Sequence, residues 1–176
     1  SIMEESIAAI KEEAESMKCL VEKLLFLSRH DKKTLKLDKK FFNMGEVVEE
    51  MLKETAMVAK DRVIDTNGTD EVIVYGDKQS LKQAVRVFID NAIKYSFEGD
   101  KITISCKNEK GNCIISVEDT GIGMREKDMD NIFERFYRSD DVRNRSIGGH
   151  GLGLSIAKLI VLKHTGTIKI RSQYLK

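Results

Sequence analysis

A glycine-rich stretch leads directly into a predicted helix and restricts how the chain can fold around it. Glycines stand at positions 148, 149, 151 and 153, and apolar residues at helical spacing follow as far as His164. Because glycine costs backbone entropy, such a cluster is expected where another group must approach the main chain closely. The first turn of a helix carries unpaired N–H groups and a partial positive charge, so the stretch predicts an anion there.

This stretch differs from the common glycine-rich phosphate loops. No Gly-Lys-Ser/Thr sequence follows it, so it is not a Walker loop, and no strand-helix-strand pattern brackets it, so it is not a dinucleotide-binding fingerprint. Other residues must therefore define the ligand.

The composition is that of a soluble globular protein. Of the 176 residues, 41% are hydrophobic and 34% charged, which argues against disorder, and the sequence lacks the roughly 18 uncharged apolar residues of a transmembrane helix. A net charge of +1 gives no support for a nucleic-acid partner. The acidic, amphipathic start does not resemble a signal peptide. We therefore expect a cytoplasmic chain.

The three cysteines have no metal-ligand spacing. Cys19, Cys106 and Cys113 are an odd number, which favours reduced thiols. Cys106 and Cys113 can face each other across a hairpin, although small core residues are the simpler interpretation.

Residues 1–30 have the pattern of a coiled-coil helix. Apolar residues recur at alternating steps of three and four, as in Ile7, Ile10, Ala14, Met17, Val21 and Leu24. A single helix cannot bury this stripe, so the pattern predicts a helical partner or a second copy. Because Ser1 is not an initiator, we expect a piece of a longer protein. The charged residues 31–40 predict a linker.

Residues 41–176 alternate between strand and helix patterns. Strands are predicted at 41–43, 62–66, 71–75, 101–107, 112–118 and 167–171, and helices at 45–60, 78–95, 125–133 and from the glycines to 164. Asp77 can cap the helix at 78–95. This order predicts an α+β fold, a two-layer α/β sandwich with helices on one face of a mixed, mostly antiparallel sheet. The last strand has no return partner, so we expect C-terminal truncation.

Asn91 and Lys94 lie along one edge of the helix predicted at 78–95. The Asn91 carbonyl oxygen can bind magnesium, which takes few protein ligands and keeps phosphate oxygens and waters. Lys94 can then neutralise phosphate charge. Both residue types are ordinary on helix surfaces, so this pair alone does not establish a site.

Asp119 follows an apolar strand and precedes Gly121 and Gly123. Its carboxylate can accept a hydrogen bond from an exocyclic amine while the glycines leave room for a flat ring. A plain turn with a local Asp hydrogen bond explains the pattern equally well.

Residues 133–138, Phe-Glu-Arg-Phe-Tyr-Arg, precede a polar stretch that ends at the first glycines. Aromatic and arginine side chains here suit a mobile flap over anionic groups, with residues 139–147 as a lid. A solvated charged loop is the alternative. Together, the glycines at 148–153, the Asn91 and Lys94 pair, the Asp119 turn and residues 133–138 predict a nucleotide pocket.

In order and spacing, these elements resemble the boxes of the ATP-binding domain of two-component sensor histidine kinases, members of the GHKL superfamily. Residues 90–96 resemble the N box, 119–123 the first glycine box, 133–138 the F box and 149–154 the second glycine box. The resemblance covers about residues 41–176, and residues 1–30 are similar to the second helix of the dimerisation and phosphotransfer hairpin.

The resemblance implies a Bergerat fold that binds ATP and Mg²⁺. It implies that Asp119 reads the adenine amine, that Asn91 holds magnesium, that Lys94 and Arg138 lie near the phosphates, and that Tyr95 lies beside the base. The other implied nucleotide-binding residues are Gly121, Gly123, Phe136, Gly149, Gly151, Leu152 and Gly153.

Two departures from the family pattern concern catalysis. The family's acceptor histidine lies in a motif of the type His-Glu-Leu-Arg-Thr-Pro, but this chain has no proline, and His30, His150 and His164 stand in other contexts. Val87 stands where the family commonly has Asn and related ATPases have a water-activating Glu, so we expect slow hydrolysis.

A third departure concerns the end of the chain. Thr165 replaces a usual glycine, and terminal strands with an adenine contact are missing.

The sequence is thus interpreted as part of a sensor histidine kinase that phosphorylates a histidine upstream of Ser1, for relay to an aspartate of a response regulator. In the intact protein, which the family suggests is a membrane-anchored bacterial sensor, the N-terminal helix region would form a homodimer. A nucleotide-sensing scaffold without phosphoryl transfer and a GHKL-type ATPase are the alternatives.

Overall fold

The structure is a computed structural model that describes residues 2–31, 35–139 and 149–174. The chain divides into two compact units, residues 1–36 and 37–176. The first contains one helix, α1 (Ile2–Asp31), whose apolar stripe is largely exposed; Ile7, Ile10, Met17 and Val21 are each more than half exposed. In the described residues, no helix is both long and apolar enough to cross a membrane.

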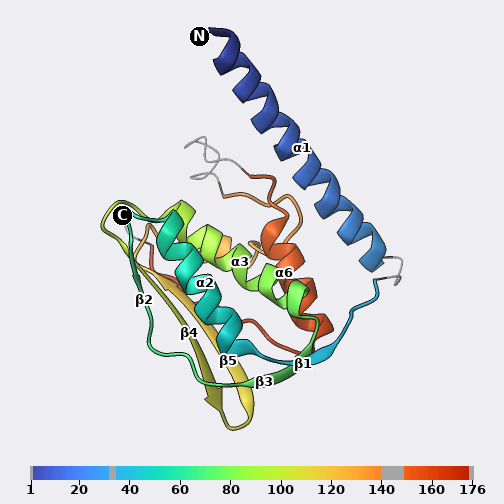
Figure 1. Cartoon of the computed structure of the whole chain (residues 1–176), viewed down its shortest axis with the longest axis vertical. Helices are drawn as coiled ribbons and strands as arrows, with labels where there is room; N and C mark the ends of the chain where they lie inside the picture. The colour runs from blue at the N-terminus through green and yellow to red at the C-terminus, as the bar shows by residue number, and fades with distance from the viewer. Residues whose placement is uncertain (1, 32–34, 140–148, 175–176) are drawn as a thin grey trace. The chain divides into compact units, whose positions relative to one another are not determined.

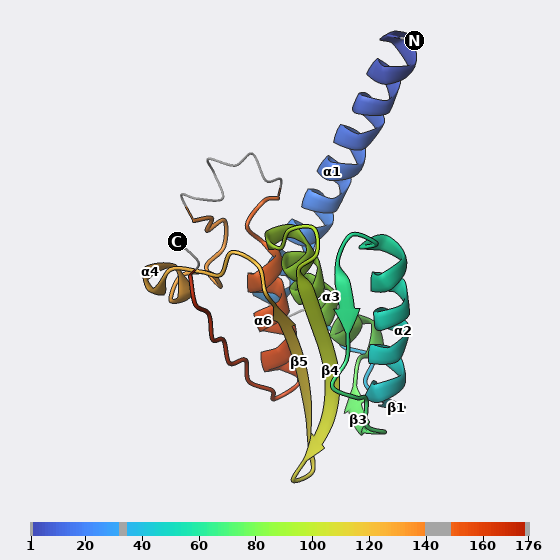
Figure 2. The same cartoon turned by 90° about the vertical axis from the view of Figure 1, so that its left-hand side faces the viewer.

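The second unit is built from five strands and four helices in the described residues (Figures 1 and 2). In chain order these are β1 (Lys40–Asn43), α2 (Met44–Val58), β2 (Val63–Asp65), β3 (Ile73–Gly76), α3 (Lys78–Tyr95), β4 (Lys101–Glu109), β5 (Asn112–Asp119), α4 (Glu126–Met129) and α6 (Gly153–Lys163). The α+β fold class predicted from the sequence is confirmed.

The strands form two hydrogen-bonded sheets. Strands β1 and β3 pair antiparallel, with Phe41 opposite Tyr75. In the second sheet β4 is central, parallel to β2 and antiparallel to β5, with Ile104 opposite Val117. The β4–β5 hairpin brings Cys106 and Cys113 together with their Sγ atoms 3.6 Å apart; both are free thiols.

Helices α2 and α3 cover one face of the long β4–β5 hairpin, and α6 lies beside α3 (Figure 1). Each of the two longer helices has a side-chain cap: Asn43 Oδ1 accepts from Gly45 N at 3.1 Å, and Asp77 Oδ1 from Ser80 N at 2.9 Å. The core between these layers includes Val48, Met51, Ile89, Ile102, Ile104 and Cys106, all fully buried.

The structure corrects two predicted elements. The helix expected at 125–133 is only Glu126–Met129, followed by turns in which Asn131 N and Ile132 N both donate to Asp128 O. The strand expected at 167–171 is not formed, because no neighbouring strand pairs with this segment in the part of the chain that the structure describes. Instead, Ser172 Oγ beyond it accepts from Met124 N at 2.8 Å.

The C-terminal end of α6 has a backbone conformation that favours glycine at position 165. Thr165 has a φ of +59°, and Gly166 N donates to Val161 O at 2.9 Å, as in a helix terminated by a left-handed residue. A β-branched residue in this conformation is strained by about 1 kcal/mol. The chain therefore carries a local cost here that glycine would remove.

Candidate nucleotide-binding site

The last two turns of α3 carry three of the predicted site residues. The opposite side of this helix is buried through Ala84, Val85, Ile89 and Ala92, which fixes the helix on the sheet. Asn91, Lys94 and Tyr95 remain partly exposed. Within the described residues the Asn91 side chain has no hydrogen-bond partner, so its carbonyl oxygen is available to a ligand.

The turn after β5 packs directly against the end of α3. Ile122 N donates to Tyr95 O at 3.0 Å. A Cβ atom added to Gly121 would lie 2.3 Å from the same carbonyl oxygen, far inside van der Waals contact. Glycine is therefore required at this position because two backbones touch, and the contact places Asp119 beside Tyr95.

Asp119 is a partly desolvated carboxylate. Burial raises the pKa of this carboxyl above its ordinary value, the charge of Asp100 adds to the rise, and the hydrogen bond from Gly121 N opposes it. Although the side chain keeps exposed surface, neighbouring atoms crowd it enough to disfavour the charged form. Its Oδ1 accepts from Gly121 N at 2.9 Å. The carboxylate retains further acceptor capacity for an N–H donor of a ligand.

Lys94 connects the end of α3 with the second glycine stretch. Its Nζ lies 5.2 Å from the centroid of the Tyr95 ring, and a Cβ added to Gly149 would lie 2.9 Å from the same atom. Burial raises the pKa of the Tyr95 hydroxyl, and the nearby Arg138 charge opposes the rise. Two cations and one aromatic ring therefore surround this end of the helix.

The predicted flap meets the second glycine stretch through its backbone. Phe136 N donates to Gly151 O at 2.9 Å, and a Cβ at Gly151 would lie 2.8 Å from Tyr137 O. Tyr137 in turn donates its hydroxyl to the buried Asp128 at 2.7 Å. The Phe136 ring stays 58% exposed. The lid expected at 139–147 and Gly148 lie outside the described residues except for Ser139.

The start of α6 lies against α3. A Cβ at Gly153 would lie 3.2 Å from Val87 Cγ1, so the apolar Val87 faces the first residue of α6. Leu152, predicted to bind nucleotide, has a side chain only 1% exposed and belongs to the core. Only its backbone is left to meet a ligand.

Gly123, like Gly121, lies against another stretch of backbone. It has a φ of +67°, and a Cβ there would lie 2.0 Å from Gln173 O, so it allows the C-terminal segment to pass close by. Glycine is needed here for this packing, and its contact with a nucleotide stays a prediction.

Asp100 and Thr120 are neighbours of the site that sequence reasoning did not single out. Thr120 Oγ1 donates to Asp100 Oδ1 at 3.2 Å and accepts from Lys101 N at 3.0 Å. The turn residues before Asp100 are visible in the sequence, but nothing in the pattern shows which side chain would face Thr120.

Comparison with known proteins identifies the family of this chain. Residues 76–176 match the family described as histidine kinase-, DNA gyrase B-, and HSP90-like ATPase. The chain is 36% identical over 172 residues to the sensor histidine kinase YkoH of Bacillus subtilis, covering 98% of this chain and 37% of that protein. It is also 36% identical over 177 residues to the histidine-protein kinase ArlS of Staphylococcus aureus, covering 100% and 39%.

A solved structure shares the fold. The histidine kinase AdeS of Acinetobacter baumannii superposes with a TM-score of 0.76 at 30% identity, covering 96% of this chain and 78% of that one. The chain thus spans less than two fifths of the length of YkoH and ArlS, and most of the length of the AdeS structure.

Proposed function

The chain belongs to the histidine kinase-, DNA gyrase B- and HSP90-like ATPase family, and on this premise we propose that it binds ATP as the catalytic domain of a sensor histidine kinase. The observation that carries the proposal is the meeting of three predicted elements at the end of α3. There the Asp119 turn contacts Tyr95, and Lys94 contacts Gly149.

The Asp119 side of this arrangement suits the adenine base. A carboxylate accepts hydrogen bonds from an exocyclic amine, and its partial desolvation strengthens such a bond. Tyr95, half-buried beside the turn, provides an aromatic surface for the base. Adenine is therefore proposed to lie between the Asp119 turn and the end of α3.

The Lys94 side suits the phosphates. Lys94 and Arg138 bring two positive charges, and the N–H groups at the start of α6 add the partial charge of a helix N-terminus. Phosphoryl transfer needs positioning and charge neutralisation more than covalent help from side chains. These groups would hold the phosphates in place for attack by an acceptor histidine.

The donor set at Asn91 fits magnesium. Its amide oxygen has no hydrogen-bond partner in the described part of the chain, and it lies one helical turn before Tyr95. Magnesium takes one or two protein oxygens together with phosphate oxygens and waters, and it neutralises phosphate charge when bound. Asn91 is accordingly the proposed ligand.

The proposed activity of the longer protein is transfer of the γ-phosphoryl group to a histidine upstream of Ser1, then to a response-regulator aspartate. The exposed apolar stripe of α1 supports a homodimer formed through this helix region. The proposed location is the cytoplasmic side of a membrane-anchored sensor.

A direct test supplies an acceptor helix in trans. The chain is incubated with γ-labelled ATP, magnesium and a separate helical hairpin that carries the acceptor histidine of a relative such as ArlS. Label on that histidine, lost when Asp119 is replaced by Asn, is the expected result. Nucleotide binding without any label would instead favour a nucleotide-sensing scaffold.

The GHKL-type ATPase remains the second alternative. Val87, which faces Gly153, has an apolar side chain and cannot act as a base that activates water. This argues for slow ATP hydrolysis. Steady-state hydrolysis that is independent of an acceptor but lost in Asp119→Asn would favour the ATPase over the kinase.

A further inference from the structure

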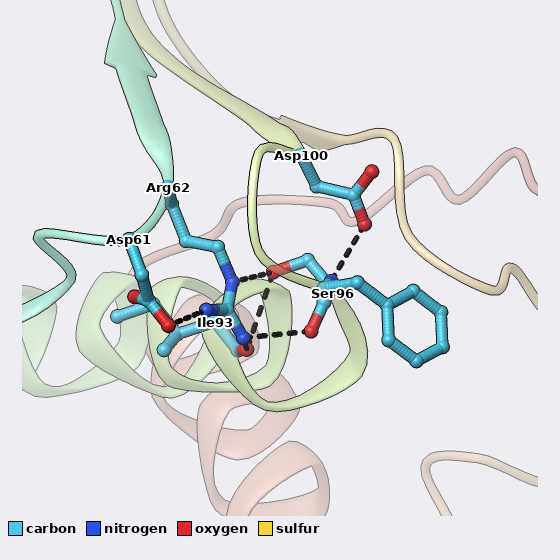
Figure 3. Close-up of polar contacts among 6 residues, drawn as sticks. Asp61, Arg62, Ile93, Ser96 and Asp100 are labelled. Carbon is cyan, nitrogen blue, oxygen red and sulfur yellow. Dashed lines mark hydrogen bonds and ion pairs between the residues drawn. The ribbon is translucent and has the colours of Figure 1, made fainter.

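Arg62 lies between α2 and β2 and reaches the C-terminal end of α3 (Figure 3). Its Nε donates to Ser96 Oγ at 3.0 Å, and its Nη2 donates to Ser96 O at 2.8 Å and Ile93 O at 3.4 Å. Only 14% of the Arg62 side chain is exposed, and Asp61 pairs with its Nη1. The largely buried guanidinium of Arg62 thus binds three acceptors at the end of α3, more than 30 residues away in sequence.

Two of the acceptors, Ile93 O and Ser96 O, are backbone carbonyl oxygens at the end of the helix, and the third is the hydroxyl of the C-cap residue Ser96. The last carbonyl groups of a helix have no intrahelical partner and carry a partial negative charge. A guanidinium presents its N–H donors in a fixed plane, so it holds several acceptors in one geometry, which a lysine ammonium does not. Arg62 therefore fixes both the position and the direction of the last turn of α3.

That turn is the part of α3 that meets the candidate site. Lys94 and Tyr95 lie between the two residues whose carbonyls Arg62 binds. Tyr95 O accepts from Ile122 N at 3.0 Å and is the atom that Gly121 approaches most closely. A shift of the helix end would therefore move the turn that positions Asp119.

A second connection joins the same helix end to the Asp119 turn. Asp100 Oδ2 accepts from Phe97 N at 2.6 Å, directly after the residues that Arg62 binds (Figure 3). Its other oxygen, Oδ1, accepts from Thr120 Oγ1 at 3.2 Å. Arg62 and Asp100 thus both hold the segment 93–97, and Thr120 is the neighbour of Asp119.

We propose that Arg62 is a positioning residue for the nucleotide site, which it controls through the C-terminal turn of α3 without touching the nucleotide. The inference rests on the proposed function, namely that ATP binds at Asp119 and the end of α3. It predicts that nucleotide affinity depends on a residue in the α2–β2 connection.

The test compares Arg62→Gln with Arg86→Gln in the full chain. Arg86 is a matched control because it is also a half-buried arginine that pairs with a carboxylate, Glu54, but it lies near the middle of α3. The dissociation constant for ATP with magnesium is measured by calorimetry at a temperature where melting curves show every variant folded. We expect Arg62→Gln to raise Kd roughly tenfold and Arg86→Gln less than about twofold.

Two further measurements separate positioning from general loss of stability. In nucleotide-free protein, the amide NMR signals of Gly121 and Ile122 are expected to shift in Arg62→Gln and to stay in place in Arg86→Gln. Arg62→Lys, which keeps the charge but not the planar set of donors, is expected to restore affinity only in part. If Arg62→Gln does not fold, Thr120→Val is measured instead. It removes the hydrogen bond to Asp100, which joins the same helix end to the Asp119 turn, and Kd is expected to rise about threefold.

Several results would overturn the inference. The first is an ATP affinity of Arg62→Gln equal to that of the wild type. Where Thr120→Val replaces Arg62→Gln, the same result in Thr120→Val has the same meaning. Arg86→Gln could weaken binding as much as Arg62→Gln. Failure of the wild-type chain itself to bind ATP would refute the proposed function instead, so the two failures are distinct.

Discussion

Gly121 and Gly149 both belong to turns at the candidate site, yet their surroundings differ. In the described residues, a Cβ at Gly121 would lie 2.3 Å from the backbone carbonyl oxygen of Tyr95, whereas the one atom within 4 Å of a Cβ at Gly149 is the terminal Nζ of Lys94, at 2.9 Å. A helix backbone cannot move aside at low cost, but the end of a lysine side chain can. The first turn is therefore part of the packed fold, and the second leaves space next to the Lys94 side chain.

The largest effect is expected when the first turn is disturbed. Gly121→Ala should lower the free energy of unfolding by about 3 kcal/mol, because the new methyl group overlaps the Tyr95 carbonyl. Urea unfolding followed by circular dichroism measures the loss. Gly99→Ala is the control: no atom of the described residues lies within 4 Å of its Cβ, and its φ of +82° should cost only about 1 kcal/mol. Equal losses in the two variants would contradict backbone packing as the reason for Gly121.

Asp119 tests whether the packed turn also binds the base. Asp119→Asn should raise Kd for ATP by about 30-fold, because the amide NH₂ faces the adenine amine in place of an acceptor. The Asn Oδ1 can still accept from Gly121 N, so the turn itself should survive. Calorimetric titration with ATP measures the effect, and Glu118→Gln, an exposed neighbour, should leave Kd unchanged. An unchanged Kd in Asp119→Asn would remove this residue from the site.

The same variant has a pH signature in stability. Burial raises the pKa of Asp119 in the folded chain, so between the unfolded and folded pKa values the folded state binds more protons than the unfolded state. The stability of the wild type relative to Asp119→Asn should therefore fall as pH rises through that acidic window. Urea unfolding of both proteins at several pH values checks this, and a rising difference would show that the carboxylate is stabilised by folding.

A smaller effect is expected at Asn91, between the two turns. Asn91→Ala should change the free energy of unfolding by no more than about 0.5 kcal/mol, because its side chain has no partner in the described residues. It should nevertheless raise Kd for ATP about tenfold in magnesium and hardly at all in EDTA. Gln83→Ala, an exposed position on the same helix, is the control. A thermal shift by ATP and magnesium equal to that of the wild type would refute the metal-ligand assignment.

The smallest effect is expected in the second turn. Gly149→Ala should cost about 1 kcal/mol of stability for its φ of +128°, since among the described residues only the Lys94 side chain must move. ATP affinity should fall about threefold, and adenosine affinity should not change, because the turn faces the phosphates. Titrations with the two ligands provide the comparison. If Gly149→Ala destabilised the protein as much as Gly121→Ala, the contrast between the two turns would disappear.

The sequence correctly predicted the elements whose caps, apolar spacing and turn residues all lie within one short segment. The bounds of α3 were predicted correctly at 78–95, because the Asp77 cap and the apolar spacing both lie within twenty residues. The β4–β5 hairpin was also predicted, and Lys110 and Gly111 form its turn with positive φ values. The strand at 167–171 was wrong because a strand exists only where a neighbouring strand pairs with it.

The residues of the candidate site were predicted from their motifs. The contacts that join these motifs in space were not predicted. Asp119, Lys94 and Gly121 were identified from their motifs, and the structure brings the turns that contain them to one helix end. Leu152 was predicted to bind nucleotide, but its side chain is in the core. Its place next to the glycines gave no information about which way it faces.

The sequence by itself determined the bounds of α3, its Asp77 cap and the positions where glycine permits close approach, because these properties depend on neighbours a few residues away. Only the tertiary structure decided that Arg62 holds the end of α3, and that Gly121 is needed against Tyr95 while Gly149 faces Lys94. Such contacts depend on how whole elements pack, and more than 20 residues separate the partners along the chain.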